Sequence, residues 1–300
     1  MNNRPIIPHL WFDTEAVEAA NFYATVFPNS SVTHVQKLSG TPSGDTDIVS
    51  FDINGQPFMA ISAGPVFKIN PSISFLVNYD PSRVENAKEQ IDAAWAKLSE
   101  GGVALMPLQE YPFSKWYGWI QDRYGVSWQL MLTNPDGEPR PFITPAMMFT
   151  GANAGRAEEA EDFYCSVFED GKIGTRARYP EGPDEGKLMY SDFYIRNSWL
   201  AAMDSSLDHK FNFNEAVSLL VQCDTQEEID EYWSKLSAVP EAEQCGWLKD
   251  TFGVSWQISP IMMETMMSEG TPEQTERVVK AFMQMKKFDL AALQAAYDGA

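Results

Sequence analysis

Residues 118–130, GWIQDRYGVSWQL, return at residues 246–258 as GWLKDTFGVSWQI, with eight identities and three conservative exchanges. In both copies apolar residues flank an Asp-x-x-Gly sequence, which begins at Asp122 and at Asp250. Glycine accepts a positive φ and aspartate hydrogen-bonds the neighbouring backbone, so this sequence predicts a tight turn between two strands. The chain therefore contains the same β-hairpin twice.

Alternation along the second strand of the hairpin separates its two faces. One face carries a serine and a glutamine, and the other carries a tryptophan. These residues are Ser127, Gln129 and Trp128 in the first copy, and Ser255, Gln257 and Trp256 in the second. We expect the two tryptophans to be core residues. Each glutamine then either faces a ligand pocket or makes a cross-strand hydrogen bond.

The duplication extends over both halves of the chain. NFYATVF at residues 21–27 corresponds to DFYCSVF at residues 162–168, and apolar and turn patterns give the order β-α-β-β-β twice in each half. We predict an α+β protein made of two tandem domains, residues 1–138 and 139–262, followed by a C-terminal helical tail at residues 263–300.

Two segments depart from the repeat. The first half carries about ten extra residues between positions 101 and 117, including Tyr111, Phe113 and Trp116. They predict either an aromatic lid over a pocket or a surface loop that packs on itself. In the tail, residues 271–274 (TPEQ) predict a capped helix, and its apolar stripe is expected to dock on the protein's own sheets or on a second subunit.

Composition limits the partners and the compartment. The chain has 42 acidic and 22 basic residues, and its net charge of −20 disfavours nucleic acid and anionic membranes. No apolar run approaches the roughly 20 residues of a membrane span, and the first residues lack a signal-peptide pattern, so we expect a cytoplasmic protein. Three cysteines without CxxC spacing indicate neither disulfides nor a zinc knuckle.

The repeated unit, the FYxxVF helix, the segment FNFNEAVSLLV at residues 211–221 and the hairpin together resemble the PhnB-like branch of the vicinal oxygen chelate superfamily. That superfamily comprises the glyoxalase, bleomycin-resistance and dioxygenase proteins, and the branch is also labelled 3-demethylubiquinone-9 3-methyltransferase-like. The resemblance implies that paired β-α-β-β-β units curl into curved mixed sheets. The ligand would lie in the concave cup, with helices on the convex face.

The resemblance also implies where a metal would bind, because many enzymes of the superfamily hold a divalent ion in the cup. The corresponding residues are His9, Ser72 and Gln129 in the first half, and Ala146, Ala216 and Gln257 in the second. Only His9 is a good ligand, so we expect no metal and no other cofactor. His9 itself is interpreted either as a general base or as a structural residue bonded to the backbone.

We therefore expect a small, partly aromatic molecule to bind without a conventional metal site. The candidate ligand-binding residues are His9, Trp11, Trp119, Ser127, Gln129, Trp247, Ser255 and Gln257. One alternative is a metal-dependent lyase, isomerase or dioxygenase, and another is a methyltransferase of the ubiquinone pathway. The glycine-rich loop of a Rossmann-like cofactor site is missing from the sequence, which disfavours the methyltransferase. A homodimer and a non-catalytic role both stay open.

Overall fold

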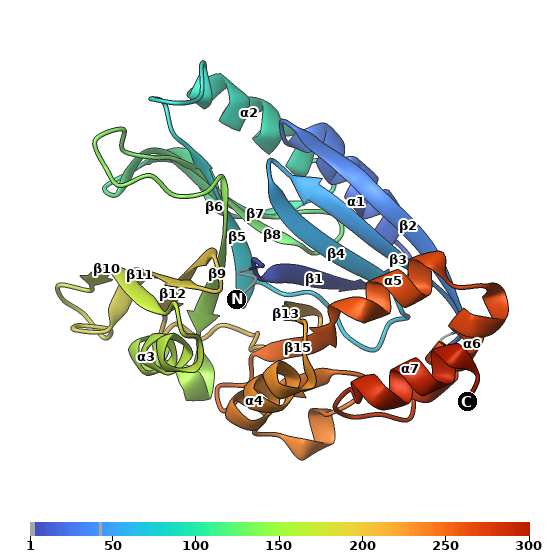
Figure 1. Cartoon of the computed structure of the whole chain (residues 1–300). Coiled ribbons are helices and arrows are strands. Elements are labelled where there is room, and N and C mark those ends of the chain that lie inside the picture. Colours follow the sequence, from blue (N-terminus) through green and yellow to red (C-terminus); the bar gives the residue numbers. More distant parts are fainter. Residues whose placement is uncertain (1–3, 42–43) are drawn as a thin grey trace.

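The computed structural model describes residues 4–41 and 44–300, and these residues form two mixed β-sheets (Figure 1). The seven-stranded sheet contains β1 (Ile7–Phe12), β2 (Ser30–Thr41), β3 (Gly44–Ile53), β4 (Gln56–Ser62), β13 (Val217–Cys223), β14 (Trp247–Lys249) and β15 (Ser255–Pro260). The eight-stranded sheet contains β5 (Ile73–Tyr79), β6 (Val103–Tyr111), β7 (Ser114–Gln121), β8 (Ser127–Leu132), β9 (Ile143–Phe149), β10 (Lys172–Arg178), β11 (Leu188–Ile195) and β12 (Ser198–Asp204).

Each sheet joins two repeat units that come from different halves. The strand orders are β14-β15-β13-β1-β4-β3-β2 and β10-β11-β12-β9-β5-β8-β7-β6. At the centre of the first sheet β1 runs antiparallel to β13, and at the centre of the second β5 runs antiparallel to β9. The predicted α+β fold of paired units is confirmed, and the two halves share both sheets. Whether residues 1–138 and 139–262 fold independently stays a prediction.

Two helices cover one face of each sheet. We call this face the core face and the opposite face the inner face. Contacts with the strands place α1 (Ala16–Val26) and α4 (Gln226–Leu236) on the seven-stranded sheet, and α2 (Ala87–Leu98) and α3 (Ala157–Val167) on the eight-stranded sheet. Within the first half the two core faces meet. There Phe58 of β4 lies 5.1 Å from Phe75 of β5, measured between ring centroids.

The repeated tryptophans are core residues, as predicted. Trp128 and Trp256 have no exposed surface, and Trp128 lies 4.8 Å from Phe27 between ring centroids. The hairpin aspartate fixes the turn and the indole together. Asp122 Oδ1 accepts backbone N–H bonds from residues 124 and 126, and Oδ2 accepts the indole N–H of Trp128 at 2.9 Å. Asp250 makes the equivalent bonds in the second copy.

Two sequence patterns, Asp80-Pro81 and Asp13-Thr14, predict helix caps that the structure does not have. Asp80 does not open a helix, because its Oδ1 accepts bonds from the backbone N–H and the hydroxyl of Ser82 and closes a turn; α2 begins later. Residues 13–14 do not cap α1 either. The backbone N–H of Ala16 donates instead to Ser62 Oγ at 3.1 Å, so β4 supplies the acceptor. At Asp80 a local turn takes the place of the capping bond, and at α1 a tertiary contact does so.

The C-terminal tail docks on the protein's own seven-stranded sheet. It forms α5 (Ile261–Glu269), α6 (Pro272–Phe282) and α7 (Leu290–Asp298), and α6 has the predicted capping box. The fourth repeat unit has only two strands after its helix. At its free edge the N–H groups of Cys245 and Gly246 donate to Met285 O and Lys286 O at 2.8 and 2.7 Å. The tail thus covers the edge where the unit is shortest (Figure 1).

At its other end the tail reaches strand β2. There Gln36 Nε2 donates to the carbonyl oxygen of Met267 in α5 at 2.9 Å. The tail therefore spans from one edge strand of the seven-stranded sheet to the other. Among the helices in residues 4–41 and 44–300, none is both long and apolar enough to cross a membrane.

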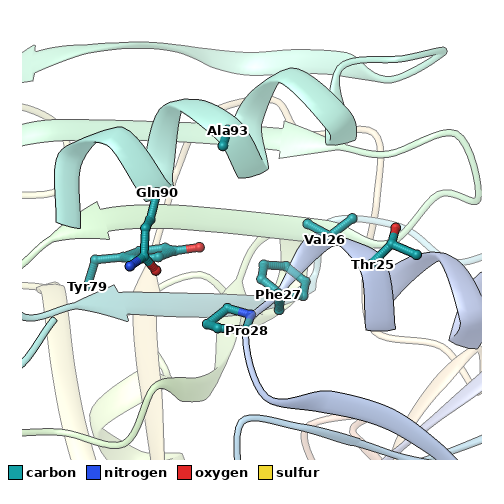
Figure 2. Close-up of a pocket in the computed structure, with 7 residues that line it drawn as sticks. All are labelled: Thr25, Val26, Phe27, Pro28, Tyr79, Gln90 and Ala93. Atoms are coloured by element: carbon teal, nitrogen blue, oxygen red, sulfur yellow. The ribbon is translucent and has the colours of Figure 1, made fainter. Parts of the chain in front are cut away.

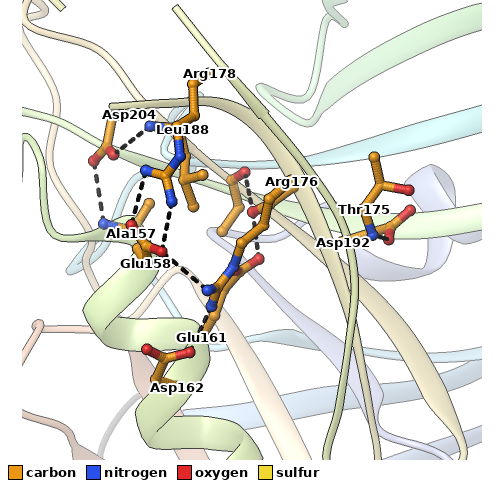
Figure 3. A network of polar contacts seen from close by, with 12 residues as sticks. Ala157, Glu158, Glu161, Asp162, Thr175, Arg176, Arg178, Leu188, Asp192 and Asp204 are labelled. Carbon is orange, nitrogen blue, oxygen red and sulfur yellow. Dashed lines mark hydrogen bonds and ion pairs between the residues drawn. The ribbon is translucent and has the colours of Figure 1, made fainter. Parts of the chain in front are cut away.

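A charged cluster ties α3 to β10 and β11 on the core face (Figure 3). Glu161 is fully buried, and its carboxyl accepts a bond from Arg176 Nε at 3.0 Å. It also contacts Ser191 Oγ, which donates to Ala202 O at 3.0 Å. The hydroxyl of Ser191 has a single proton. When Ser191 donates this proton to Ala202 O, the carboxyl of Glu161 must be protonated and donate to Ser191 Oγ. Burial raises the pKa of Glu161 to about 7.

This raised pKa predicts that the protein loses stability as the pH rises. A carboxyl with a higher pKa in the folded than in the unfolded chain stabilises the fold below the unfolded pKa, near 4.5, and that contribution is lost as the pH rises through 7. Glu161→Gln mimics the protonated form. From pH 4.5 to 8, the free energy of unfolding of the wild type should therefore fall by about 2 to 3 kcal/mol relative to the variant.

Denaturant unfolding at several pH values measures this difference. Glu158→Gln is the matched control from the same helix, because the hydrogen bond from Arg178 lowers the pKa of Glu158. Relative to Glu158→Gln, the wild type should therefore gain stability as the pH rises, and it should do so at lower pH than the change seen with Glu161→Gln. If the wild type instead gained stability relative to Glu161→Gln between pH 4.5 and 8, the raised pKa of Glu161 would be contradicted.

Candidate functional site

The candidate residues divide between two separate inner faces. His9 and Gln257 lie in the seven-stranded sheet, whereas Gln129 and Ala146 lie in the eight-stranded sheet. The grouping by sequence halves, which placed His9 beside Gln129, is therefore wrong. It failed because each sheet is assembled from both halves.

A row of polar side chains crosses the inner face of the seven-stranded sheet. His9 of β1 is the register partner of Ser218 of β13, which is the register partner of Ser255 of β15. Since neighbouring strands lie about 4.8 Å apart, this row spans roughly 10 Å. Gln257 joins it, because its Nε2 donates to Ser218 Oγ at 2.9 Å. The resemblance placed the metal-ligand position of this segment at Ala216, whereas the residue of β13 in register with His9 is Ser218, two residues later.

Aromatic rings border this row. The ring of Trp247 stands edge-on to His9, with centroids 5.4 Å apart, and lies 6.1 Å from the ring of Trp11. Trp11 is held in turn by Phe67, at 5.1 Å between centroids, and by a 2.8 Å bond from its indole N–H to Gly64 O. Both tryptophans are half-buried, so each presents ring surface beside the polar row.

Two polar atoms in this row have no hydrogen-bond partner among the described residues. They are His9 Nδ1 and Ser255 Oγ, in side chains that are only 4% and 1% exposed. The backbone bond expected for a structural histidine is not found at Nδ1. Burial lowers the pKa of His9 to about 3, so the imidazole is neutral at physiological pH and too weak to serve as an efficient general base there.

The inner face of the eight-stranded sheet satisfies its own polar groups. Gln129 Oε1 accepts the hydroxyl proton of Tyr117 at 2.7 Å, and its Nε2 donates to Ser74 Oγ at 2.7 Å. The indole N–H of Trp119 donates to Ser127 Oγ at 2.7 Å. Gln129 thus makes the cross-strand bonds that were one of its two expected roles. Ser255, the counterpart of Ser127, has no hydrogen-bond partner for its hydroxyl among the described residues. The two inner faces therefore differ in whether this serine is paired.

Apolar side chains form a cluster on this second face. Tyr117, Trp119 and Met148 are buried together. Part of the extra segment of the first half forms β6 and the turn to β7, and its rings Tyr111 and Phe113 lie 5.6 and 5.0 Å from the ring of Tyr117. The segment is therefore neither of the expected alternatives in full, because it is mostly a strand and the rings of Tyr111 and Phe113 pack on the inner face. Its third ring, Trp116, contacts α2, where its indole N–H donates to Asp92 at 2.7 Å.

Arg140, in the turn-rich segment 134–141, adds a partly buried ion pair to the eight-stranded sheet. Arg140 donates from Nε to Asp192 Oδ2 at 2.9 Å and from a terminal nitrogen to Oδ1 at 3.2 Å. Its guanidinium carbon lies 3.8 Å from the ring centroid of Trp199. From the sequence, residues 134–141 predicted only a polar linker. A single arginine in a turn-rich segment gives no signal of a buried partner 52 residues away.

A family model described as 3-demethylubiquinone-9 3-methyltransferase matches residues 4–131 and 141–259. The chain belongs to this family. Among solved structures, a PhnB protein from Bacillus cereus, described there as a putative 3-demethylubiquinone-9 3-methyltransferase, is 37% identical, covers 43% of this chain and 100% of its own, and has a TM-score of 0.39. Glyoxalase I from Zea mays is 11% identical, covers 83% of this chain and 90% of its own, and has a TM-score of 0.55.

The comparison with glyoxalase I concerns the fold alone. Among curated proteins, none matches the chain. The family match confirms the resemblance to the 3-demethylubiquinone-9 3-methyltransferase-like proteins over two regions of the chain, and the glyoxalase fold is shared.

The metal that this superfamily commonly carries does not fit the side chains of this PhnB-like protein. On the seven-stranded sheet the donors are one imidazole, two hydroxyls and one carboxamide, from His9, Ser218, Ser255 and Gln257. Across the described part of the chain, no three His, Cys, Asp or Glu side chains form a group that could hold a metal ion. Neutral oxygen donors hold a divalent first-row ion weakly, and a single imidazole does not compensate.

Proposed function

We propose that this PhnB-like protein binds a small, uncharged, partly aromatic molecule on the inner face of the seven-stranded sheet, without a conventional metal site. One observation carries the proposal: His9 Nδ1 and Ser255 Oγ are buried and unpaired beside the half-buried rings of Trp11 and Trp247. Leaving a buried polar group unpaired costs about 1 to 3 kcal/mol, which a ligand that bonds to it recovers.

The chemistry of the face supports this ligand class. The two indoles supply flat apolar surface, and the polar row supplies acceptors and hydroxyls without a formal charge. A neutral His9 offers one ring nitrogen as an acceptor and the other as a donor. The corresponding face of the eight-stranded sheet has already paired its glutamine and its indole N–H, which favours a single site per chain.

A screen of uncharged heteroaromatic molecules tests the proposal, with thermal shift and native mass spectrometry as readouts. At least one compound should raise the melting temperature of the wild type and be retained by it. His9→Leu should abolish the shift for that compound, whereas Ser127→Ala on the other inner face should keep it. A screen without any retained or stabilising compound, or a hit that His9→Leu still binds, would contradict the proposal.

Binding measurements alone distinguish two other activities from the proposed function. A lyase, isomerase or dioxygenase of the superfamily type requires that a divalent ion stabilise the protein in the same thermal assay. The family description names a methyltransferase, which requires S-adenosylmethionine to bind in isothermal titration. Clear micromolar binding of S-adenosylmethionine would replace the proposal with that activity.

A further inference from the structure

A cavity of about 220 Å³ opens on the core side of the molecule, between the end of α1, strand β5 and helix α2 (Figure 2). Its apolar walls come from Val26, Phe27, Pro28 and Ala93. None of the residues that line it carries a charge. The cavity is built by the core-face side of the first half, so it is distinct from the inner face that carries His9.

One of the residues that line this cavity carries an unpaired hydroxyl. Tyr79 at the end of β5 has no exposed surface, and its Oη has no hydrogen-bond partner among the described residues. Its ring is fixed edge-on against Phe142, with centroids 5.1 Å apart. Burial raises the pKa of the Tyr79 phenol, so the group remains a hydrogen-bond donor at physiological pH. The corresponding residue of the second half is Cys223, which supplies no such donor.

A second polar group lies over Tyr79. Figure 2 shows the side-chain amide of Gln90, from α2, in front of the Tyr79 ring. Gln90 Nε2 donates to the carbonyl oxygen of Glu85 at 3.0 Å, which leaves Oε1 as an acceptor. Gln90 is only half-buried on a helix surface, so its side chain can rotate and open the way to the tyrosine hydroxyl. One donor, the Tyr79 hydroxyl, and one acceptor, Gln90 Oε1, therefore belong to the residues that line the cavity.

The second half carries a larger side chain at one corresponding position of its helix. Alignment of WAKLS with WSKLS puts Tyr232 at the position of Ala94. The Tyr232 ring packs on Phe168, the counterpart of Phe27, with centroids 5.1 Å apart, and its hydroxyl accepts a 2.9 Å bond from Arg196. The first half has the small, buried Ala94 at this position, next to Ala93, which lines the cavity. The helix of the first half therefore carries no ring where the helix of the second half carries one.

We infer that this cavity is a second ligand site, which takes an uncharged single-ring molecule bearing a carboxamide. The carbonyl of the carboxamide accepts the Tyr79 hydroxyl, and its N–H donates to Gln90 Oε1. The ring lies among Val26, Phe27 and Pro28. An apolar cavity of about 150 Å³ is large enough to hold benzene, so 220 Å³ accommodates one substituted ring and not a bicyclic dinucleotide fragment.

Titration of the full chain with benzamide, followed by ¹H–¹⁵N NMR, tests this inference. We expect saturable shifts of the backbone signals of residues 25–28, 79, 90 and 93. Loss of one hydrogen bond, worth about 1 kcal/mol, should weaken binding about fivefold in Tyr79→Phe. Ala93→Phe, which places a ring over the cavity mouth, should abolish the shifts. Benzoate, with the same ring and a negative charge, should bind more weakly than benzamide.

The control separates this site from the inner face. Gln257→Leu should leave the benzamide shifts around Tyr79 unchanged, because that side chain lies on the opposite side of another sheet. Absence of saturable shifts around Tyr79, equal affinity of wild type and Tyr79→Phe, or equal affinity for benzoate would overturn the inference. None of these outcomes depends on whether the inner face binds a ligand.

Discussion

Trp256→Ala is expected to lower the free energy of unfolding by about 3 to 5 kcal/mol, because it removes a large, fully buried ring and leaves a cavity. The ring lies 5.3 Å from that of Tyr164, and its N–H donates to Asp250 at 2.8 Å. The substitution therefore removes both the packing and one of the bonds that fix the hairpin turn. Denaturant unfolding of the two proteins measures the difference.

Trp247→Ala is the matched control, since it removes the same ring type from the same hairpin. Trp247 is half-buried on the inner face, so its loss should cost less than half as much stability. If the two variants were equally destabilised, Trp247 would be a core residue and the assignment of faces would fail.

Gln257→Leu and Gln129→Leu are expected to act in opposite ways, although the two glutamines are repeat counterparts. Among the described residues, the Gln257 side chain bonds only Ser218, so Gln257→Leu should cost about 1 kcal/mol of stability and abolish binding of the ligand found by screening. Gln129→Leu leaves the hydroxyls of Tyr117 and Ser74 unpaired in the interior, and should cost about 2 to 4 kcal/mol.

Thermal unfolding and ligand titration of both variants check this pair. Binding at the His9 face should survive in Gln129→Leu at temperatures where the variant is folded. Loss of binding in Gln129→Leu with retention in Gln257→Leu would place the ligand on the eight-stranded sheet. That result would contradict the proposed site.

The sequence predicted the elements that depend on local chemistry. The Asp-x-x-Gly turns, the facing of Trp128 and Trp256 and the capping box of α6 each follow from residues close together in the chain, and the structure confirms them. The start of α2 was missed because Asp80 satisfies a turn just as well as a helix cap. Local signals of this kind do not distinguish the two.

The assembly of the site could not be predicted from either half alone. The pairing of β1 with β13 joins residues more than 200 positions apart, and no local pattern encodes which copy a strand chooses as its neighbour. For the same reason the Arg140–Asp192 ion pair gave no signal. The candidate residues were identified individually, and their grouping required the structure.

The central claim is that the inner face of the seven-stranded sheet binds a ligand. A crystal structure of the protein with its best screening hit tests this claim most directly. The account predicts ligand density in contact with His9 Nδ1 and between Trp11 and Trp247, with Gln129 still bonded to Tyr117 and Ser74. Density beside Gln129, or a divalent ion held by inner-face side chains, would contradict it.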